Sequence, residues 1–416
     1  MKVVNLVHLQ DYLKTQEKEI TTWYKRKMNY FNEKNVLLPV FSSFDIRDNG
    51  HKVSIVDSNV FPSGFNNLDS SSRKYASTQF LNYLSSISHE RYILIITENH
   101  TRNTYYFSNI KTLSHILTQA GFKTFLGFIE ENGDPHPRIV MDNNGTSLEL
   151  ERIIRNGNSI HTKSFCNGII LLNNDFSVKR PEILDNINQL VLPPISLGWF
   201  NRKKSTHFRC FTKYLKEIAS FISFDPWLLD TFSTHVDNIN FKEKDSLHDV
   251  AEAVDFIIDK ISLKFKEYHI NEKPLVFIKN NSGTYGLGII SVSSGKEIKH
   301  LNSKNRKKMI LGKERSRIDS VLIQEGITSK YTVDNCPAEP VIYNVGGKVV
   351  GGFMRVNRLQ DKYKNLNTRG MFFEEIIEND LTRSLILKNG EFSLYSMLTM
   401  IANLAIADEC HQNIAN

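Results

Sequence analysis

Short apolar runs alternate with helical stretches in the first half of the sequence, and this alternation limits the folds open to the chain. Residues 91–97 contain an apolar run with almost no polar residue between, which is typical of a strand buried on both faces. Residues 109–120 place apolar side chains at helical spacing and end before Gly121, and residues 125–129 and 168–172 have the composition of further strands. Strands separated by helices predict an α/β fold with a mostly parallel sheet, in which ligands bind beyond the carboxyl ends of the strands.

The second half of the sequence has a different pattern. Residues 207–221 and 246–266 have helical spacing, and longer strands with glycine-containing turns follow them. The segment 191–194, which contains two prolines, is typical of a connection between domains. We therefore predict an N-terminal, mostly parallel α/β domain over residues 1–195 and a second domain over residues 196–416.

Composition excludes several classes of protein. The 416 residues are 40% hydrophobic and 23% charged, which argues against a disordered or fibrous chain. The net charge of +7 would suit an anionic ligand or nucleic acid, but the basic residues are dispersed. The four cysteines are far apart, the N-terminal residues lack a signal-peptide pattern, and no apolar run is long enough to span a membrane. We expect a soluble cytoplasmic protein without a zinc site or a disulfide framework.

The strongest local signal is a strand that ends in Lys279, enters a glycine-containing loop and returns as a second strand. Gly283, Gly286 and Gly288 allow close approach of the backbone, whose N–H groups can then hold phosphate oxygens. Lys279 would add a positive charge beside those phosphates. The loop has neither the GK[ST] of a Walker A loop nor the following helix of a dinucleotide-binding fingerprint. The pattern fits a flap over nucleotide phosphates, although a plain β-hairpin would use the same glycines.

Three further elements follow the glycine loop. A strand ends in Gln324 and Glu325, two strands joined by a Gly-Gly-Lys turn carry Glu339 and Arg355, and an asparagine-containing loop follows at residues 365–367. This order resembles that of the ATP-grasp ligases, which activate a carboxylate as an acyl phosphate that an amine then attacks. Cations for a triphosphate and oxygen ligands for Mg²⁺ are both present.

Polar loops in the first half could recognise a small zwitterion. They lie at residues 44–47, 56–67 and 97–103. An arginine in such a loop can bind a carboxylate through two parallel hydrogen bonds, and an acid can bind an ammonium group. The candidates are Arg47 and Arg102 for a carboxylate and Asp45, Asp57 and Glu98 for an ammonium. Asn, Asp and Ser also form turns readily, so simple turns would account for part of this pattern.

With both halves considered, the sequence is similar to a known family, the ATP-grasp-like glutamate–cysteine ligases of proteobacteria, first known from iron-oxidising bacteria. The stretches that carry the resemblance run in unbroken order from near residue 45 to near residue 375. They are DIRDNGHKVSIVDSNVFPSGFNNL (45–68), ILIITENHTRN (93–103), IILLNNDFS (169–177), VLPPISLGWFNRKKSTHF (191–208), FIKNNSGTYGLGI (277–289), EPVIYNVGGKVVGGFMRVN (339–357) and NLNTRGMFF (365–373).

The resemblance implies an enzyme that joins the γ-carboxylate of glutamate to the amine of cysteine. The products would be γ-glutamylcysteine, ADP and phosphate, with γ-glutamyl phosphate as the intermediate, in the first step of glutathione biosynthesis. The resemblance also implies an ATP-grasp-like second domain that uses ATP and Mg²⁺. The partners would be the small-molecule substrates, with no nucleic acid and no membrane.

The resemblance and the residue chemistry together suggest roles for individual residues. The expected catalytic residues are Lys279 and Arg355. The expected nucleotide contacts are Lys279, Ser282, Gly283, Thr284, Tyr285, Gly286, Gly288, Gln324 and Glu325. The expected amino-acid site consists of Asp45, Arg47, Asn59, Asn66, Asn67, Glu98, Asn99 and Arg102. The expected Mg²⁺ ligands are Glu339, Asn365 and Asn367.

Two alternatives stay open at the level of sequence. The same nucleotide machinery could serve another γ-glutamyl or dipeptide ligase with a different amine acceptor. The positive charge could instead belong to a non-catalytic protein that binds a nucleotide or a nucleic acid. A nucleic-acid-binding protein would have a basic stripe among exposed aromatic residues, whereas the 26 phenylalanines lie mostly in apolar runs.

Overall fold

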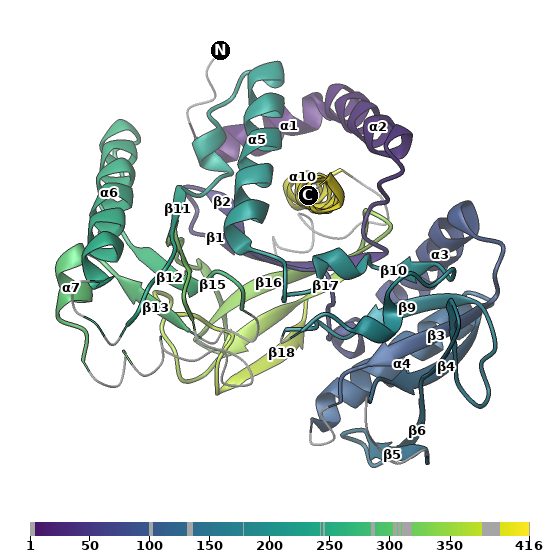
Figure 1. Cartoon of the computed structure of the whole chain (residues 1–416). Coiled ribbons are helices and arrows are strands. Elements are labelled where there is room, and N and C mark those ends of the chain that lie inside the picture. Colours follow the sequence, from purple (N-terminus) through teal and green to yellow (C-terminus); the bar gives the residue numbers. More distant parts are fainter. Residues whose placement is uncertain are drawn as a thin grey trace.

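The computed structural model describes residues 5–99, 103–130, 136–177, 179–241, 243, 246–283, 288–302, 306, 309, 318–376 and 392–415. Three larger sheets lie side by side in Figure 1, and helices cover them. The predicted α/β fold is confirmed.

A central antiparallel sheet combines strands from distant parts of the chain. Its order is β18-β17-β16-β1-β2, and β15 also pairs with β16. The strands are β1 (Phe41–Asp48), β2 (Val53–Asn59), β15 (Tyr331–Val333), β16 (Cys336–Val345), β17 (Lys348–Asn357) and β18 (Met371–Glu375). Gly346 and Gly347 join β16 to β17 with φ of 54° and 76°, a turn geometry that glycine adopts at little cost.

A second sheet is mostly parallel, as the sequence predicts. Its order is β10-β9-β3-β4-β6-β5, and only β5 runs antiparallel to its neighbour. The strands are β3 (Tyr92–Thr97), β4 (Lys123–Phe128), β5 (Arg138–Met141), β6 (Ser147–Arg152), β9 (Ile169–Asn173) and β10 (Val191–Leu192), with the hairpin of β7 (Ile154–Asn156) and β8 (Ser159–His161) nearby in sequence. Ile93 and Ile95 pack against helices α3 (Ser70–Ile87) and α4 (Thr104–Gln119), while Leu94 and Ile96 join a separate cluster on the other face. Burial on both faces explains why this run lacks polar alternation.

A third, four-stranded sheet contains the predicted strand–loop–strand unit. Its order is β11-β14-β12-β13, and all the pairings are antiparallel. The strands are β11 (Ser233–Val236), β12 (Val276–Asn280), β13 (Ile289–Val292) and β14 (Val321–Glu325). Helix α6 (Ser246–Glu267) packs on this sheet, and α7 (Gly295–Lys299) packs beside α6. Lys279 lies opposite Ile289 at the end of β12.

Helix α10 (Leu394–Ala415) runs through the middle of a helical layer (Figure 1). It contacts α2 (Glu17–Glu33), α5 (Lys204–Ile222), β2 and β17, and α1 (Leu6–Thr15) packs on α2. Residues 401–410 are buried without interruption, which suits a helix that is apolar on most faces. Its polar side chains have partners: Ser42 Oγ donates to Asn403 Oδ1 (2.8 Å) and Asn344 Nδ2 donates to Thr399 Oγ1 (3.1 Å).

The predicted division near residue 195 stays a prediction. Strands β1 and β2 precede that position, and β1 pairs with β16, which follows it. The central sheet is therefore shared between the two parts of the chain. Within the described residues, no helix combines the length and the apolar composition needed to cross a membrane.

Candidate active site

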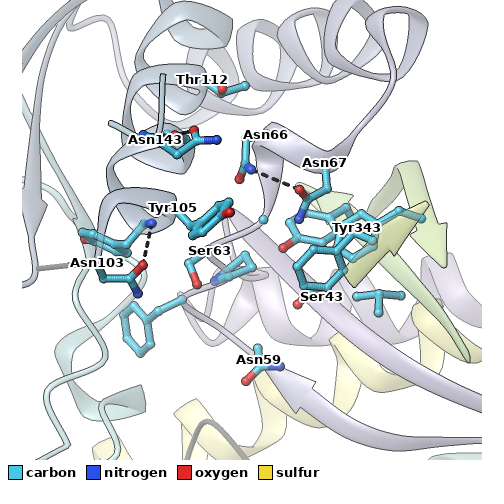
Figure 2. Close-up of a pocket in the computed structure, with 18 of the residues that line it drawn as sticks. Ser43, Asn59, Ser63, Asn66, Asn67, Asn103, Tyr105, Thr112, Asn143 and Tyr343 are labelled. Atoms are coloured by element: carbon cyan, nitrogen blue, oxygen red, sulfur yellow. Dashed lines mark hydrogen bonds between the residues drawn. The ribbon is translucent and has the colours of Figure 1, made fainter. Parts of the chain in front are cut away.

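A wide pocket lies where the central sheet meets the parallel sheet. Its volume is ≈ 970 Å³. The walls come from the end of β2 and the loop after it, the end of β3, the start of α4, and strands β16 to β18 (Figure 2). The predicted residues that line it are Asn59, Asn66, Asn67, Glu98, Arg355 and Asn367. Four of the residues expected in the amino-acid site are thus brought together in one cavity.

The loop after β2 approaches the central sheet closely because Gly64 has no side chain. A Cβ atom at residue 64 would lie 2.5 Å from Tyr343 Oη and 3.2 Å from Phe353 Cζ. This close approach presents Asn66 and Asn67 to the pocket, where Asn66 Nδ2 donates to Asn67 Oδ1 (3.0 Å), as Figure 2 shows. Amide side chains of this kind can donate to a carboxylate and accept from an ammonium group.

Acidic residues follow two neighbouring parallel strands at the wall of the wide pocket. Glu98 directly follows β3, and Asp175 lies two residues beyond β9, which pairs with β3. Both residues are buried. Tyr106 Oη accepts from Glu98 N (2.9 Å) and donates to Asn173 O (2.7 Å), so the tyrosine joins the two strand ends. The carboxyl ends of the parallel strands therefore bring negative charge to the cavity, in keeping with the usual position of ligands in such sheets.

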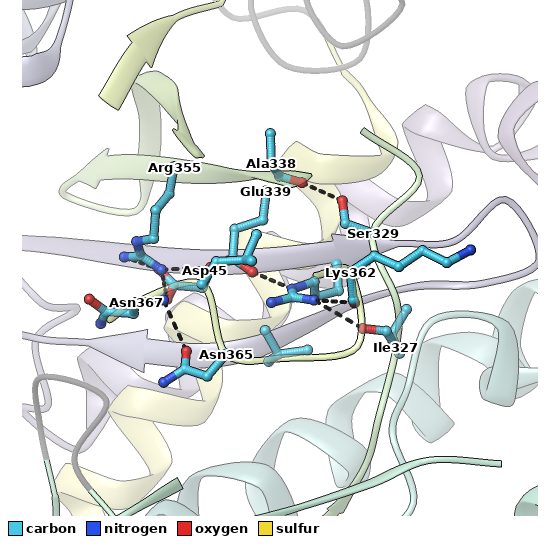
Figure 3. A network of polar contacts seen from close by, with 12 residues as sticks. Asp45, Ile327, Ser329, Ala338, Glu339, Arg355, Lys362, Asn365 and Asn367 are labelled. Carbon is cyan, nitrogen blue, oxygen red and sulfur yellow. Dashed lines mark hydrogen bonds and ion pairs between the residues drawn. The ribbon is translucent and has the colours of Figure 1, made fainter. Parts of the chain in front are cut away.

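A buried cluster of alternating charges, drawn in Figure 3, reaches the wide pocket through Arg355. Arg355 Nη1 lies 2.5 Å from Asp45 Oδ2 and 2.9 Å from Glu339 Oε1, and Glu339 Oε2 also pairs with Arg47 Nε. The register of the central sheet explains the contact, because β16 and β17 place Glu339 opposite Arg355. We call these four residues the charge cluster.

Burial acts to raise the pKa of both acids of the charge cluster, but the arginines offset it to different extents. Burial raises the pKa of Asp45 above its usual range, and Arg355 offsets only part of that effect. Burial would also raise the pKa of Glu339, but Arg47 and Arg355 together lower it. Glu339 is thus held as a carboxylate by two cations.

A second, narrow pocket is lined by three residues of the charge cluster, Asp45, Arg47 and Glu339. It measures ≈ 40 Å³, and its walls come from β1, β2, β12 to β14, β16 and the loop at 365–367. The predicted residues that line it are Asp45, Arg47, Lys279, Gln324, Glu325, Glu339, Asn365 and Asn367. Because Asn367 lines both pockets and Arg355 pairs with acids that line the narrow one, the two pockets meet at the charge cluster.

Lys279 is the buried lysine that lines the narrow pocket. Its Nζ donates to Val56 O (2.6 Å) and to Gln324 Oε1 (2.7 Å). Burial lowers the pKa of Lys279 to about 8, although nearby Asp57 opposes the change. Burial would raise the pKa of Asp57, but Lys204, which pairs with it, and Lys279 lower it to about 2.

Comparison with known proteins identifies the family of the chain. The sequence matches the family model described as glutamate-cysteine ligase over residues 10–410. The fold is similar to the crystal structure of a protein from Methylobacillus flagellatus KT named "putative gamma-glutamylcysteine synthetase". The identity is 32%, the match covers 97% of this chain and 96% of the other, and the TM-score is 0.85. The chain belongs to the glutamate–cysteine ligase family.

More distant solved structures also match, and no curated protein does. A glutathione synthetase-like effector from Globodera pallida has 12% identity and a TM-score of 0.42, with 88% of this chain and 86% of the other covered. D-alanyl-alanine synthetase A from Vibrio cholerae has 10% identity and a TM-score of 0.31, with 71% and 77% covered. We draw no conclusion about this ligase from likenesses at that level.

Some of the predicted site residues of the ligase lie apart from the wide pocket or already have partners. Arg47 lies in the narrow pocket, where it pairs with Glu339 and its Nη2 donates to Lys364 O (3.0 Å). Asn99 is exposed and its Nδ2 donates to Ile129 O (2.6 Å). The carboxylate of Glu325 lies 2.8 Å from Lys52 Nζ and accepts from Trp227 Nε1 (3.1 Å). The roles predicted for these residues stay predictions.

The predicted phosphate loop is described only at its two ends. Ser282 N donates to Asn280 Oδ1 (3.1 Å), Gly283 is buried, and Gly288 O accepts from Asn280 N (3.2 Å). Gly288 has a φ of 65°. The remaining predicted contacts of the loop and one predicted carboxylate ligand lie outside the described residues: Thr284, Tyr285, Gly286 and Arg102.

Sequence reasoning missed several residues that the fold brings to the site. Lys204, at the start of α5, pairs with Asp57, and its backbone N donates to Asn281 O (2.8 Å) at the base of the glycine loop. Trp199 lines the wide pocket, and Lys204 Nζ lies 4.8 Å from the centroid of its ring in a cation–π contact. These residues carry no local motif, and the only signal for them is their place within the stretch 191–208 that resembles the family.

Proposed function

We propose that this chain is an ATP-dependent glutamate–cysteine ligase that forms γ-glutamylcysteine, the first intermediate of glutathione biosynthesis. An oxygen of the glutamate γ-carboxylate would attack the γ-phosphorus of ATP, and the bond to ADP would break. The cysteine amine would then attack the acyl carbon of γ-glutamyl phosphate. Phosphate would leave with the bonding electrons, and the amine would release a proton. The chemistry needs no nucleophile from the protein.

The observation that carries the proposal is the meeting of two unlike pockets at the charge cluster. The wide pocket has amides and acids suited to amino acids, and the narrow pocket has a buried lysine suited to phosphate. A phosphoryl group that passes from one ligand to the other must cross their junction, where Arg355 lies. A guanidinium at that position would stabilise the charge of the transferring group.

Lys279 and the backbone between residues 282 and 288 would bind the phosphates of ATP, with the adenine near Gln324 and Glu325 in an ATP-grasp-like arrangement. The narrow pocket of ≈ 40 Å³ is too small for a nucleotide, so ATP must displace groups that now bond across it. The hydrogen bonds from Lys279 to Val56 and Gln324 are the ones that ATP could displace, because phosphate oxygens would replace both acceptors.

The oxygen donors around the narrow pocket fit Mg²⁺. Glu339, Asn365 and Asn367 are the predicted ligands, and the carboxylates of Asp45 and Asp57 line the same space. Hard oxygen donors are what Mg²⁺ prefers. An ion bound there would neutralise charge on the phosphate oxygens. The protein's own contribution is to hold Glu339 ionised, which its two arginine partners achieve.

Positioning would supply much of the rate, because two small zwitterions and ATP must be aligned. Asn59, Asn66, Asn67 and Glu98 line the wide pocket and would contact the amino acids. Asp45 would act through Arg355, with which it pairs.

We also propose a cytoplasmic location, since the four cysteines are free thiols.

The test is phosphate release from Mg-ATP with glutamate, in the presence and absence of cysteine, followed by mass spectrometry of the product. We expect phosphate release that depends on cysteine and γ-glutamylcysteine as the product. Phosphate release with glutamate and a different amine would support the ligase assignment but would mean that cysteine is not the acceptor. Phosphate release that does not depend on glutamate at all would overturn the proposal.

A further inference from the structure

The wide pocket contains a guanidinium group that has no acidic partner in the part of the chain that the structure describes. This group belongs to Arg73, in the first turns of α3. The nearest acid in sequence, Asp69, is the N-cap of that helix, and its oxygens accept from Ser72 N (2.9 Å), Ser72 Oγ (2.6 Å) and Ser71 Oγ (2.6 Å). Asp69 is therefore engaged in capping rather than in neutralising Arg73.

The hydrogen bonds of Arg73 are incomplete. Its Nη2 donates to Asn66 O (2.7 Å), which fixes the side chain against the loop after β2. Its Nε is buried and has no hydrogen-bond partner. A buried N–H without a partner is unfavourable, and more so on a charged group. Within the described residues Nη1 makes no hydrogen bond either, and it is not enclosed as Nε is, so this end of the guanidinium can donate to a ligand that supplies an acceptor.

The other large cations of the wide pocket are already paired. Lys111 Nζ lies 3.0 Å from Asp142 Oδ2 and 2.7 Å from Thr146 Oγ1. Arg355 is neutralised by Asp45 and Glu339. Of the three Lys and Arg residues that line the wide pocket in the described part of the chain, Arg73 is thus the one whose charge is left for a ligand.

The chemistry of the ligand follows from that of the guanidinium. The planar group can bind a carboxylate through two parallel hydrogen bonds. Asn66 and Asn67, which lie beside Arg73, offer further amide donors. Glu98 and Asp175 are acidic residues that line the same pocket, and their charge is complementary to that of an ammonium group. An α-amino acid carries both groups.

We propose that Arg73 binds the α-carboxylate of an amino-acid substrate and thereby determines specificity for α-amino acids. The proposal rests on the proposed ligase function. The γ-carboxylate of glutamate must reach the junction at Arg355 to react, so the carboxylate at Arg73 is one that does not react. It belongs either to glutamate or to cysteine, and the two sources can be separated by experiment.

The experiment compares the wild type with Arg73→Met in steady-state kinetics. Removal of a charged hydrogen bond should raise the KM of one amino acid by about 10- to 100-fold, with the KM of ATP unchanged. Substrates that lack the α-carboxylate identify the source: 4-aminobutyrate replaces glutamate, and cysteamine replaces cysteine. The wild type should prefer the complete amino acid, and Arg73→Met should lose that preference for one of the two pairs.

Two further variants keep the test decisive. Lys111→Met removes a cation from the same pocket that is already paired, and it should change neither KM by more than about twofold. Arg73→Lys retains the charge without the planar group and should recover only part of the affinity. If both amino-acid KM values stay unchanged in Arg73→Met, the proposal is wrong.

Failure of the proposed function would look different. If the wild type forms no γ-glutamylcysteine, the ligase assignment fails whatever Arg73 does. Calorimetric titration of glutamate and cysteine into the wild type and Arg73→Met then still tests the carboxylate site. Equal affinity in the two proteins, or no binding to either, would overturn the role of Arg73.

Discussion

Lys279 is a cation that the fold buries, and we expect its titration to give ATP binding a characteristic pH dependence. Because its pKa is lowered to about 8, the ammonium is present below that pH and is lost as the pH rises through it. We expect the KM of ATP to rise above pH 8 in the wild type. In Lys279→Arg the guanidinium stays charged, so the KM of ATP should stay nearly constant between about pH 7 and pH 10. The KM of ATP is the appropriate readout, because the cysteine amine titrates in the same range.

The corresponding loss-of-charge variant is Lys279→Ala. It should weaken ATP binding by about 10- to 100-fold, because a charged hydrogen bond to phosphate is removed. Unchanged ATP affinity together with unchanged turnover at saturating ATP would contradict the role of the β12–β13 unit as a phosphate flap.

Asp57 should contribute to stability through its pairing with Lys204. Its folded pKa of about 2 lies below the ordinary value of 3.8, so its contribution is complete above the ordinary pKa and disappears as the pH falls toward 2. Asp57→Asn should lower the free energy of unfolding by about 2 kcal/mol at neutral pH. The difference from the wild type, measured by urea unfolding at several pH values, should shrink as the pH is lowered. A difference that does not depend on pH would argue for lost packing instead.

At the scale of elements, the loop after β2 depends on Gly64 for its position against the central sheet. In Gly64→Ala the new methyl group would lie 2.5 Å from Tyr343 Oη, so the loop or the Tyr343 side chain must shift. We expect higher KM values for the amino acids and an unchanged KM for ATP, since the narrow pocket does not include this loop. The double variant Gly64→Ala/Tyr343→Phe removes the closest contact and should recover part of the loss. Equal defects in the single and double variants would argue against this steric explanation.

The sequence predicts individual helices, strands and turns well, but it predicts poorly which distant elements contact one another. Lys279 at a strand end and the turn between β16 and β17 follow from local pattern, because strand period and glycine geometry are properties of neighbouring residues. Asp45 and Arg47 are two residues apart on β1 and therefore share a face. Their position beside Glu339, rather than in the wide pocket, depends on the pairing of β1 with β16. Pairing between segments so distant in sequence leaves no periodic signal.

At the scale of the whole molecule, Glu409 of α10 connects the helical layer to β2, next to the candidate active site, through Arg202. It lies 2.8 Å from Arg202 Nε and 2.5 Å from His207 Nδ1, and Arg202 Nη1 in turn donates to Ser58 O of β2 (2.7 Å). Glu409→Gln would leave Arg202 buried without a counter-charge and should lower the free energy of unfolding by about 3 kcal/mol or more. Glu374→Gln, the same change at an exposed position, should cost less than about 0.5 kcal/mol in urea unfolding. Similar losses in the two variants would mean that Glu409 has no special role.

The sharing of the central sheet between β1 and β16 has a consequence for the order in which the protein can be made. The ribosome synthesises β1 and β2 long before β16. Strand β16 supplies Glu339 and pairs with the edge of β1 that β2 leaves unpaired. The parallel sheet can pair its own strands during that interval, since all of them precede residue 195. The nascent chain must therefore carry an unpaired strand edge until the last quarter of translation, and the charge cluster can assemble only after that point.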